Sequence, residues 1–216
     1  DDAKCTLLRA LIIGPEGTPY SGGCFQFDIF FPTQYPLTPP QVHFCTTGLG
    51  QVRFNPNLYS CGTVCLSLLG TWKGLQGEQW HETSTLLQVL ISIQSLILVP
   101  EPYFNEPGYE TLLGTDRGKR FSQSYNEDII IHTIAHAMVA QLKRPCSGFE
   151  DVIKKHFQIK KKRILKEIRG HMKSHNSKAL QKAYDSLKIE LDKLPPFSSK
   201  KTGTSSKEET IVKEDI

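Results

Sequence analysis

The stretch Phe54-Asn55-Pro56-Asn57-Leu58-Tyr59-Ser60-Cys61-Gly62-Thr63-Val64-Cys65-Leu66-Ser67-Leu68-Leu69 decides which fold and chemistry this sequence is expected to have. Its pattern is an extended Asn-Pro-Asn segment, a turn, and a cysteine flanked by apolar residues. Such an arrangement can hold the amide of Asn57 and the thiol of Cys65 on one surface. A thiolate takes up an acyl group, and a fixed amide hydrogen-bonds the oxyanion that forms when a thioester is attacked. The pairing therefore favours acyl transfer.

Two other interpretations of this stretch stay open from the residues alone. Asn57 could satisfy the backbone of a turn, and Cys65 could be a small buried apolar residue, which is the usual place of a free cysteine. Cys61 and Cys65 also have the spacing C-x3-C, with Cys45 and His81 elsewhere in the chain. Structural zinc normally takes two close pairs of ligands, and the sequence has no second pair. We therefore predict neither a metal nor a cofactor.

The composition is that of an ordinary soluble globular protein. The chain has 216 residues, six cysteines and a formal net charge of +4, which suits one core with helical appendages. The scattered cysteines favour a reducing compartment, so we expect a cytoplasmic protein, with the nucleus as a further location. The apolar run 86–99 is too short to span a bilayer, and no membrane insertion is expected. The start of the chain has neither an initiator Met nor a signal-peptide pattern, which indicates a piece of a longer protein.

Alternating apolar residues predict strands at residues 7–15, 24–31 and 41–45, with a short fourth strand near residues 51–54. The segments are close in sequence and joined by turns, so they favour an antiparallel meander. The proline-rich residues 35–40 cannot lie in the centre of a sheet. The fold class is therefore expected to be α+β, with the sheet packed on the helices that follow.

Helical periodicity begins near residue 83, where Thr83 or Ser84 can cap a helix that ends before Pro100. Further helices are predicted at residues 128–142, at the strongly basic residues 149–169 and at residues 180–194. After Pro196 the chain has almost nothing to bury and is expected to be disordered. We therefore predict a main domain over residues 1–145, a helical extension over 146–195 and a tail over 196–216.

Several motifs in their order resemble the catalytic domain of ubiquitin-conjugating enzymes. That family has a Y-P-x-x-P-P loop, an H-P-N tripeptide and an active cysteine eight residues after the Asn. The matching stretches here are Tyr35-Pro36-Leu37-Thr38-Pro39-Pro40, Asn55-Pro56-Asn57 and Cys65-Leu66, followed by Trp72 and Trp80. The resemblance covers roughly residues 8–140. Within the family it is strongest to the giant BIR-containing BRUCE or apollon type, and then to the large hybrid conjugating enzyme/ligases.

This resemblance implies a specific reaction. Cys65 would receive the C-terminal glycine of ubiquitin from the ubiquitin-activating enzyme and pass it to a lysine of a substrate protein, with built-in ligase character as in the large relatives. Asn57 would donate to the oxyanion, brace the loop, or do both. Asn55 stands where the family usually has His, a loop-bracing residue, and an Asn can replace it in that role.

The resemblance also aligns Glu106 with the gate Asp of the family, so its carboxylate would orient the entering lysine and help to remove its proton. Asn105 would share this work by hydrogen bonding. Ser67 replaces a common acidic residue, so the acidity near the lysine must come from elsewhere. The alternative is that Glu106 is a solvent-exposed loop residue without a role.

The Y-P-x-x-P-P loop would be the docking surface for RING or HECT ligases, with Leu37 and Pro39 as its candidate contacts. Small members of the family present a Phe where this chain has Leu37, which puts ordinary ligase pairing in doubt. Trp72 and Trp80 are expected to pack under the insertion between them rather than to bind a partner.

Two further alternatives concern function as a whole. The basic helix at residues 149–169 carries no aromatic stacking platform, so we expect a regulatory or acidic-substrate surface rather than nucleic-acid binding. A noncatalytic ubiquitin-binding module on the same fold would normally lack the cysteine, and the presence of Cys65 with Asn57 favours an active enzyme. The first helix of the family's domain is expected to be absent or truncated, because only residues 1–6 precede the first strand.

Overall fold

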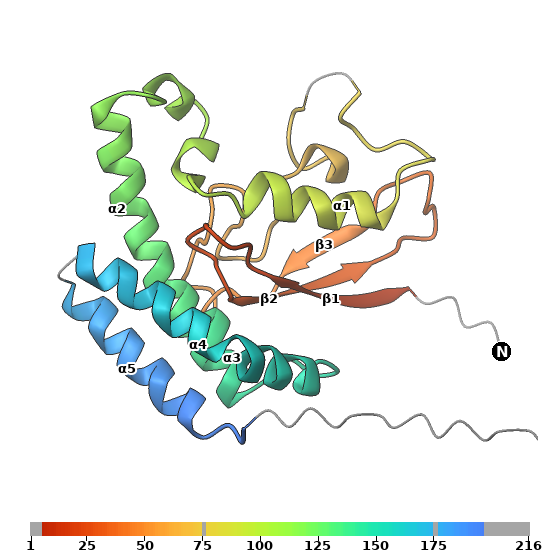
Figure 1. The fold of residues 1–216 in the computed structure, drawn as a ribbon. Coiled ribbons are helices and arrows are strands. Elements are labelled where there is room, and N and C mark those ends of the chain that lie inside the picture. Colours follow the sequence, from red (N-terminus) through yellow and green to blue (C-terminus); the bar gives the residue numbers. More distant parts are fainter. Residues whose placement is uncertain (1–5, 75–76, 175–176, 197–216) are drawn as a thin grey trace, which may run out of the picture.

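The computed structural model describes residues 6–74, 77–174 and 177–196, and its fold is α+β, as predicted (Figure 1). One antiparallel sheet contains three strands in the order β1, β2, β3. The strands are β1 (Leu7–Ile13), β2 (Cys24–Phe30) and β3 (Gln41–Phe44). Strands adjacent in sequence pair directly, with Leu7 opposite Phe30 and Phe27 opposite Phe44. The predicted meander is therefore confirmed.

The fourth strand predicted near residues 51–54 is wrong, because this part of the described chain is a loop. Beyond β3 the neighbouring backbone belongs to Thr63, which forms an isolated bridge with His43. The backbone before Cys65 therefore occupies the edge that a fourth strand would take. Val52 and Phe54 are buried while Arg53 is exposed, so the alternation that suggested a strand comes from a loop packed on the core.

An aromatic cluster fills the core between the sheet and the helix above it in Figure 1. The rings of Phe25 and Phe54 meet edge-on with centroids 5.5 Å apart, and those of Phe27 and Phe44 lie 5.2 Å apart. The helix is α1 (Leu86–Ser92), which continues as the π-helical turn η2 (Ile93–Ile97). This core anchors the loop from Asn55 to Cys65, because Phe54, which immediately precedes the loop, is part of the core.

The start of α1 differs by one or two residues from the prediction. The cap is Thr85, whose hydroxyl accepts from the amide of Gln88 at 3.3 Å, while the Gln88 side chain accepts from the amide of Thr85 at 2.8 Å. This reciprocal capping box satisfies two backbone donors at once, which neither Thr83 nor Ser84 does here.

A longer helical segment begins twelve residues before the position predicted, at α2 (Asp116–His132), and continues through η5 (Thr133–Val139) and α3 (Ala140–Lys143). Thr115 caps it, and the side chain of Thr115 accepts from the amide of Gly118. The buried positions in its first turns are the small residues Gly118 and Ser122. Small residues give no apolar periodicity, so the pattern predicted only the later part of the helix.

The helical extension consists of α4 (Glu150–Ser174) and α5 (Lys178–Asp192), which lie side by side (Figure 1). A second apolar cluster joins them to η5 and to Cys24 of β2. The imidazole Nε2 of His156 lies 2.9 Å from the carbonyl of Gly22, and Ser21 donates to Glu167 at 2.9 Å. Both contacts fix α4 against the turn between β1 and β2.

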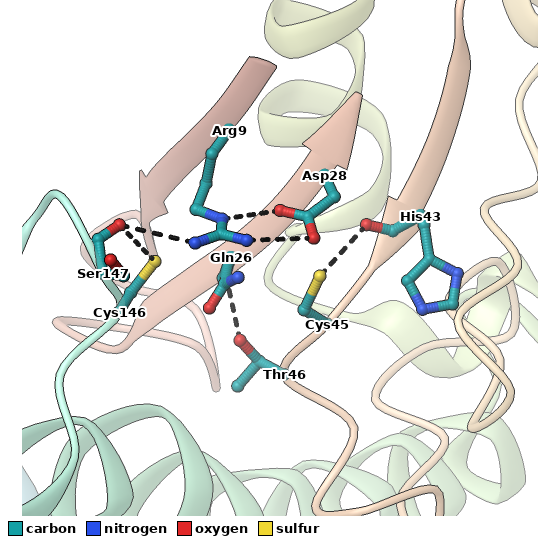
Figure 2. Close-up of polar contacts among 8 residues, drawn as sticks. All are labelled: Arg9, Gln26, Asp28, His43, Cys45, Thr46, Cys146 and Ser147. Atoms are coloured by element: carbon teal, nitrogen blue, oxygen red, sulfur yellow. Dashed lines mark hydrogen bonds and ion pairs between the residues drawn. The ribbon is translucent and has the colours of Figure 1, made fainter. Parts of the chain in front are cut away.

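Arg9 of β1 makes a further link to the extension, shown in Figure 2. Its guanidinium donates to Asp28 of β2 at 2.7 Å and to the carbonyl of Ser147 at 3.5 Å. The hydrogen bond from Arg9 lowers the pKa of the Asp28 carboxyl. The segment before α4 is thus tied to the face of the sheet that lies opposite the aromatic core.

The predicted domain boundaries after residues 145 and 195 stay predictions. Residues 197–216 of the predicted tail lie outside the described residues. Residues 1–5 also lie outside them, so the prediction that the first helix is absent or truncated stays a prediction. Within the described ranges, no helix has the length and apolar character needed to cross a membrane.

Candidate functional site

Asn55 is the buried hydrogen-bonding centre of the loop that leads to the candidate cysteine. It is fully buried, and its amide nitrogen donates to the hydroxyl of Tyr20 at 3.1 Å and to the carbonyl of Ile97 at 2.7 Å. Its amide oxygen accepts from the backbone of Asn57 at 2.8 Å and from the side chain of Asn105 at 3.3 Å. The side chain thus joins the loop to the turn after β1, to η2 and to the segment of Asn105.

We expect the substitution Asn55→Leu to lower the free energy of unfolding by about 3 kcal/mol, since a buried polar group left without its partner costs about 1–3 kcal/mol. The carbonyl of Ile97 and the amide of Asn57 would both lose their partner. Urea unfolding measures the change, with Asn105→Ala as a control that removes one partly buried and one exposed hydrogen bond. A loss below about 1 kcal/mol for Asn55→Leu would contradict this role.

Asn57 and Cys65 face each other across a tight loop. The side-chain amide of Asn57 donates to the carbonyl of Cys65 at 2.9 Å, and the amide of Cys65 donates to the carbonyl of Asn57 at 2.9 Å. Gly62 has φ 92°, and a Cβ there would lie 2.0 Å from the ring of His43, so only glycine fits the turn. The sequence-predicted pair is therefore brought together, although the amide contacts the backbone of Cys65 and not its thiol.

The thiol of Cys65 lies in a mostly buried position, with the residue 8% exposed. Burial raises the pKa of the Cys65 thiol above its ordinary value, while a hydrogen bond from Tyr59 and the positive charge of Arg53 oppose this rise. A phenol and a guanidinium thus offset part of the effect of burial on the Cys65 thiol; the sequence motifs assigned neither group to the site.

Cys61 is the rival thiol, and it lies exposed in the same loop. Its sulfur lies 3.3 Å from the hydroxyl of Thr63, and this hydrogen bond lowers the pKa of the Cys61 thiol. Within the described ranges, no three His, Cys, Asp or Glu side chains lie where they could hold a metal ion. The two cysteines differ in setting: Cys65 is held by the Asn57 backbone pairing, whereas Cys61 is at the tip of the turn.

Asn105 and Glu106 reach the site from the segment after η2, where Asn105 ends η3 (Pro102–Asn105) and Glu106 follows it. The carboxylate of Glu106 accepts from Arg53 at 3.1 Å, and Asn105 donates to the carbonyl of Leu96 at 3.0 Å as well as to Asn55. Glu106 is thus ion-paired to a residue that also acts on Cys65. Arg53 and Tyr59 could not be found from sequence motifs, because only the folded loop places them beside the thiol.

A comparison with known proteins identifies the family. A family model described as ubiquitin-conjugating enzyme matches residues 1–128. The chain belongs to the ubiquitin-conjugating enzyme family. This confirms the family predicted from the motifs.

Relatives of this ubiquitin-conjugating chain are longer than it is. It is 52% identical over 170 residues to the probable ubiquitin-conjugating enzyme protein 17 of Caenorhabditis elegans, covering 79% of this chain and 23% of that protein. It is 45% identical over 211 residues to the human dual E2 ubiquitin-conjugating enzyme/E3 ubiquitin-protein ligase BIRC6, covering 90% of this chain and 4% of that protein. A solved E2 domain of a Toxoplasma gondii ubiquitin conjugating enzyme aligns with a TM-score of 0.44 and 28% identity, covering 63% of this chain and 84% of that one. The chain thus spans less than a quarter of either curated relative.

In this ubiquitin-conjugating domain a second carboxylate lies near the cysteine segment. Ser67, in η1 (Ser67–Leu69), donates to Glu78 at 3.4 Å. Glu78 belongs to the insertion before Trp80. Sequence reasoning placed no acid at Ser67, and the structure brings one there from the insertion.

The candidate ligase-docking loop of this conjugating enzyme is exposed at its tip. Leu37 is 66% exposed, while Pro39 is partly buried. The indole of Trp80 donates to the carbonyl of Pro36 at 2.7 Å, and its ring lies 5.8 Å from that of Tyr35. Trp80 therefore packs against this loop rather than simply under the insertion, whereas Trp72 is 40% exposed.

Proposed function

We propose that this chain carries ubiquitin as a thioester on Cys65 and transfers it to a substrate lysine. The observation that carries the proposal is the 2.9 Å hydrogen bond from the Asn57 amide to the Cys65 carbonyl, since it fixes an amide donor next to the nucleophile. The alternative is a noncatalytic ubiquitin-binding module, which needs neither a thiol nor an amide at these positions.

Charging of Cys65 needs little help from the chain. The Cys65 thiolate attacks the carbonyl carbon of the ubiquitin thioester on the activating enzyme, and that enzyme's thiolate leaves. One carbon–sulfur bond replaces another, so the exchange is nearly balanced in energy. The raised pKa of the Cys65 thiol leaves only a small thiolate fraction at neutral pH, and Tyr59 and Arg53 limit that rise; a nearly balanced exchange can proceed from this fraction.

Transfer to lysine is the demanding step. The neutral amine attacks the thioester carbonyl carbon, an oxyanion forms, the carbon–sulfur bond breaks and the Cys65 thiolate leaves. An amine with a pKa near about 10.4 is mostly protonated at neutral pH, so Glu106 orients the lysine and takes up a proton from it. The Asn57 amide has two N–H groups; one braces Cys65 and the other can donate to the oxyanion.

The test is formation of a ubiquitin adduct by the wild-type chain with activating enzyme, ATP and ubiquitin. We expect an adduct that is stable in denaturant and lost on addition of reductant, and that discharges when free lysine is added. Omission of ATP is the control. Tight ubiquitin binding without any adduct would favour the noncatalytic module instead.

We expect Glu106→Ala to slow discharge to lysine near neutral pH on the order of a hundredfold. The defect should shrink as pH approaches the pKa of the amine, because free amine then becomes abundant without a carboxylate. Single-turnover discharge between about pH 6.5 and 9.5 measures it, with Glu106→Gln as the variant of matched shape. A defect that stays constant with pH would mean that Glu106 only positions its loop.

The partners proposed for the chain follow from the same reaction: ubiquitin, the ubiquitin-activating enzyme and substrate proteins. Leu37 and Pro39 are the proposed contacts for a RING or HECT ligase, and the exposure of Leu37 suits such a contact. Built-in ligase character and a cytoplasmic location belong to the proposal as well.

A further inference from the structure

Arg53 is held at the site by three contacts. Its Nη2 donates to the carbonyl of Pro56 at 2.7 Å and to the carboxylate of Glu106 at 3.1 Å, and its guanidinium carbon lies 4.5 Å from the centre of the Tyr59 ring. These contacts come from Pro56 within the Asn-Pro-Asn segment, from Tyr59 after it and from the Glu106 loop. A cation over an aromatic ring gains further electrostatic attraction, so the guanidinium has a defined position beside Cys65.

Much of the guanidinium stays available to a ligand. The side chain of Arg53 is 43% exposed, and among the described residues all its hydrogen bonds run through Nη2. A guanidinium has five N–H donors in a planar fork. Nη1 can therefore donate to a carboxylate from solution while Nη2 keeps its protein partners.

The charges of Arg53 and Glu106 offset each other before an acceptor arrives. The guanidinium and the carboxylate form an ion pair at 3.1 Å. Burial raises the pKa of the nearby Tyr125 to about 12, so its phenol stays neutral and adds no charge. When a lysine ammonium approaches Glu106, two cations share one carboxylate, and like charges brought together repel each other. A second carboxylate on the acceptor would restore the balance by pairing with Arg53.

We propose that Arg53 is a specificity-determining residue that selects acceptor lysines with an acidic residue beside them. The inference rests on the proposed function, because it concerns the lysine that reacts with the Cys65 thioester. The substrate class is therefore a lysine in an acidic peptide segment, recognised by a charge-assisted hydrogen bond from Nη1 of Arg53.

The experiment compares discharge of the preformed thioester to two short peptides. One has glutamate on both sides of its central lysine, and the other has glutamine at both positions. We expect discharge to the glutamate peptide to be about two- to fivefold faster, the size that an exposed ion pair supports. The preference should appear mainly in KM, since the contact forms on binding, and it should fall with added salt.

Variants of Arg53 make the ratio of the two rates diagnostic. Arg53→Met keeps a long stem without the charge and should bring the ratio to about one, whereas Arg53→Lys should retain part of the preference. A role of Arg53 in merely positioning Glu106 would change both rates equally and leave the ratio unmoved. Equal rates for the two peptides in wild type, or a preference that survives in Arg53→Met, would overturn this inference. If no thioester forms at all, the proposed function fails and this inference fails with it.

Discussion

Replacing Cys65 with serine is expected to abolish the reductant-sensitive ubiquitin adduct or to convert it into a reductant-resistant ester. A serine hydroxyl in the same position can form an ester, and an ester is not cleaved by the thiols that exchange with a thioester. The loss should be complete because no other cysteine of the described chain has its backbone paired with Asn57. Non-reducing and reducing gels of the charging reaction measure the result.

Cys61→Ser is the matched control, since Cys61 lies in the same loop and is more exposed than Cys65. Its thiol is a serious rival, because the hydrogen bond with Thr63 lowers its pKa whereas burial raises that of Cys65. Accessibility and ionisation alone would thus favour Cys61. Survival of the adduct in Cys65→Ser together with its loss in Cys61→Ser would show that the nucleophile is assigned to the wrong thiol.

The sequence predicted those parts of the fold in which local pattern and tertiary packing agree. Alternation in β2 predicts a strand, and its apolar residues Phe25, Phe27 and Ile29 are buried. The same rule failed at residues 51–54, because Val52 and Phe54 bury against the core while the neighbouring edge of β3 is taken by Thr63. Burial alternates in both segments, and only the identity of the hydrogen-bonding neighbour separates a strand from a loop.

In the candidate site, too, the sequence predicted the contacts between residues close in the chain and missed those between distant ones. Asn57 and Cys65 are close in sequence, and the turn at Gly62 brings them together, so their spacing sufficed to predict that they meet. Arg53 meets Glu106 across 53 residues, and no periodicity relates positions so distant. Glu78 reaches Ser67 from an insertion, and an insertion has no counterpart in the family motif. Contacts between loops that are distant in sequence can be found only in the folded chain.

Asn55 shows how a departure from a motif can be interpreted physically. The sequence predicted that an Asn could brace the loop where the family has His, and the buried amide does so with two donated and two accepted hydrogen bonds. An amide both donates and accepts, so it satisfies the Ile97 carbonyl and the Asn57 backbone with one side chain. The loop before the cysteine therefore depends on Asn55 for its shape, which leaves Asn57 free for a separate role.

Asn57→Ala is expected to slow discharge of the thioester to lysine by about a hundred- to a thousandfold, the effect of losing one oxyanion donor in other acyl-transfer sites. Charging of Cys65 should fall much less, because exchange between thioesters needs less help than attack by an amine. The structure gives the amide one bracing contact, to the Cys65 carbonyl, and the second N–H of the same nitrogen remains for the oxyanion.

The two roles of Asn57 separate in single-turnover measurements of charging and of discharge to free lysine. Asn57→Asp retains the shape of the side chain but, as a carboxylate, has no N–H to donate, so it should lose both the bracing bond and the oxyanion contact. Because the paired backbones of Asn57 and Cys65 still hold the loop through the 2.9 Å bond from the Cys65 amide, charging should persist in both variants. Equal losses of charging and discharge would mean that the loop collapses without the side chain, and the oxyanion role would then have to be abandoned. A selective loss of discharge in both variants would instead assign the second N–H of Asn57 to the transition state of lysine transfer.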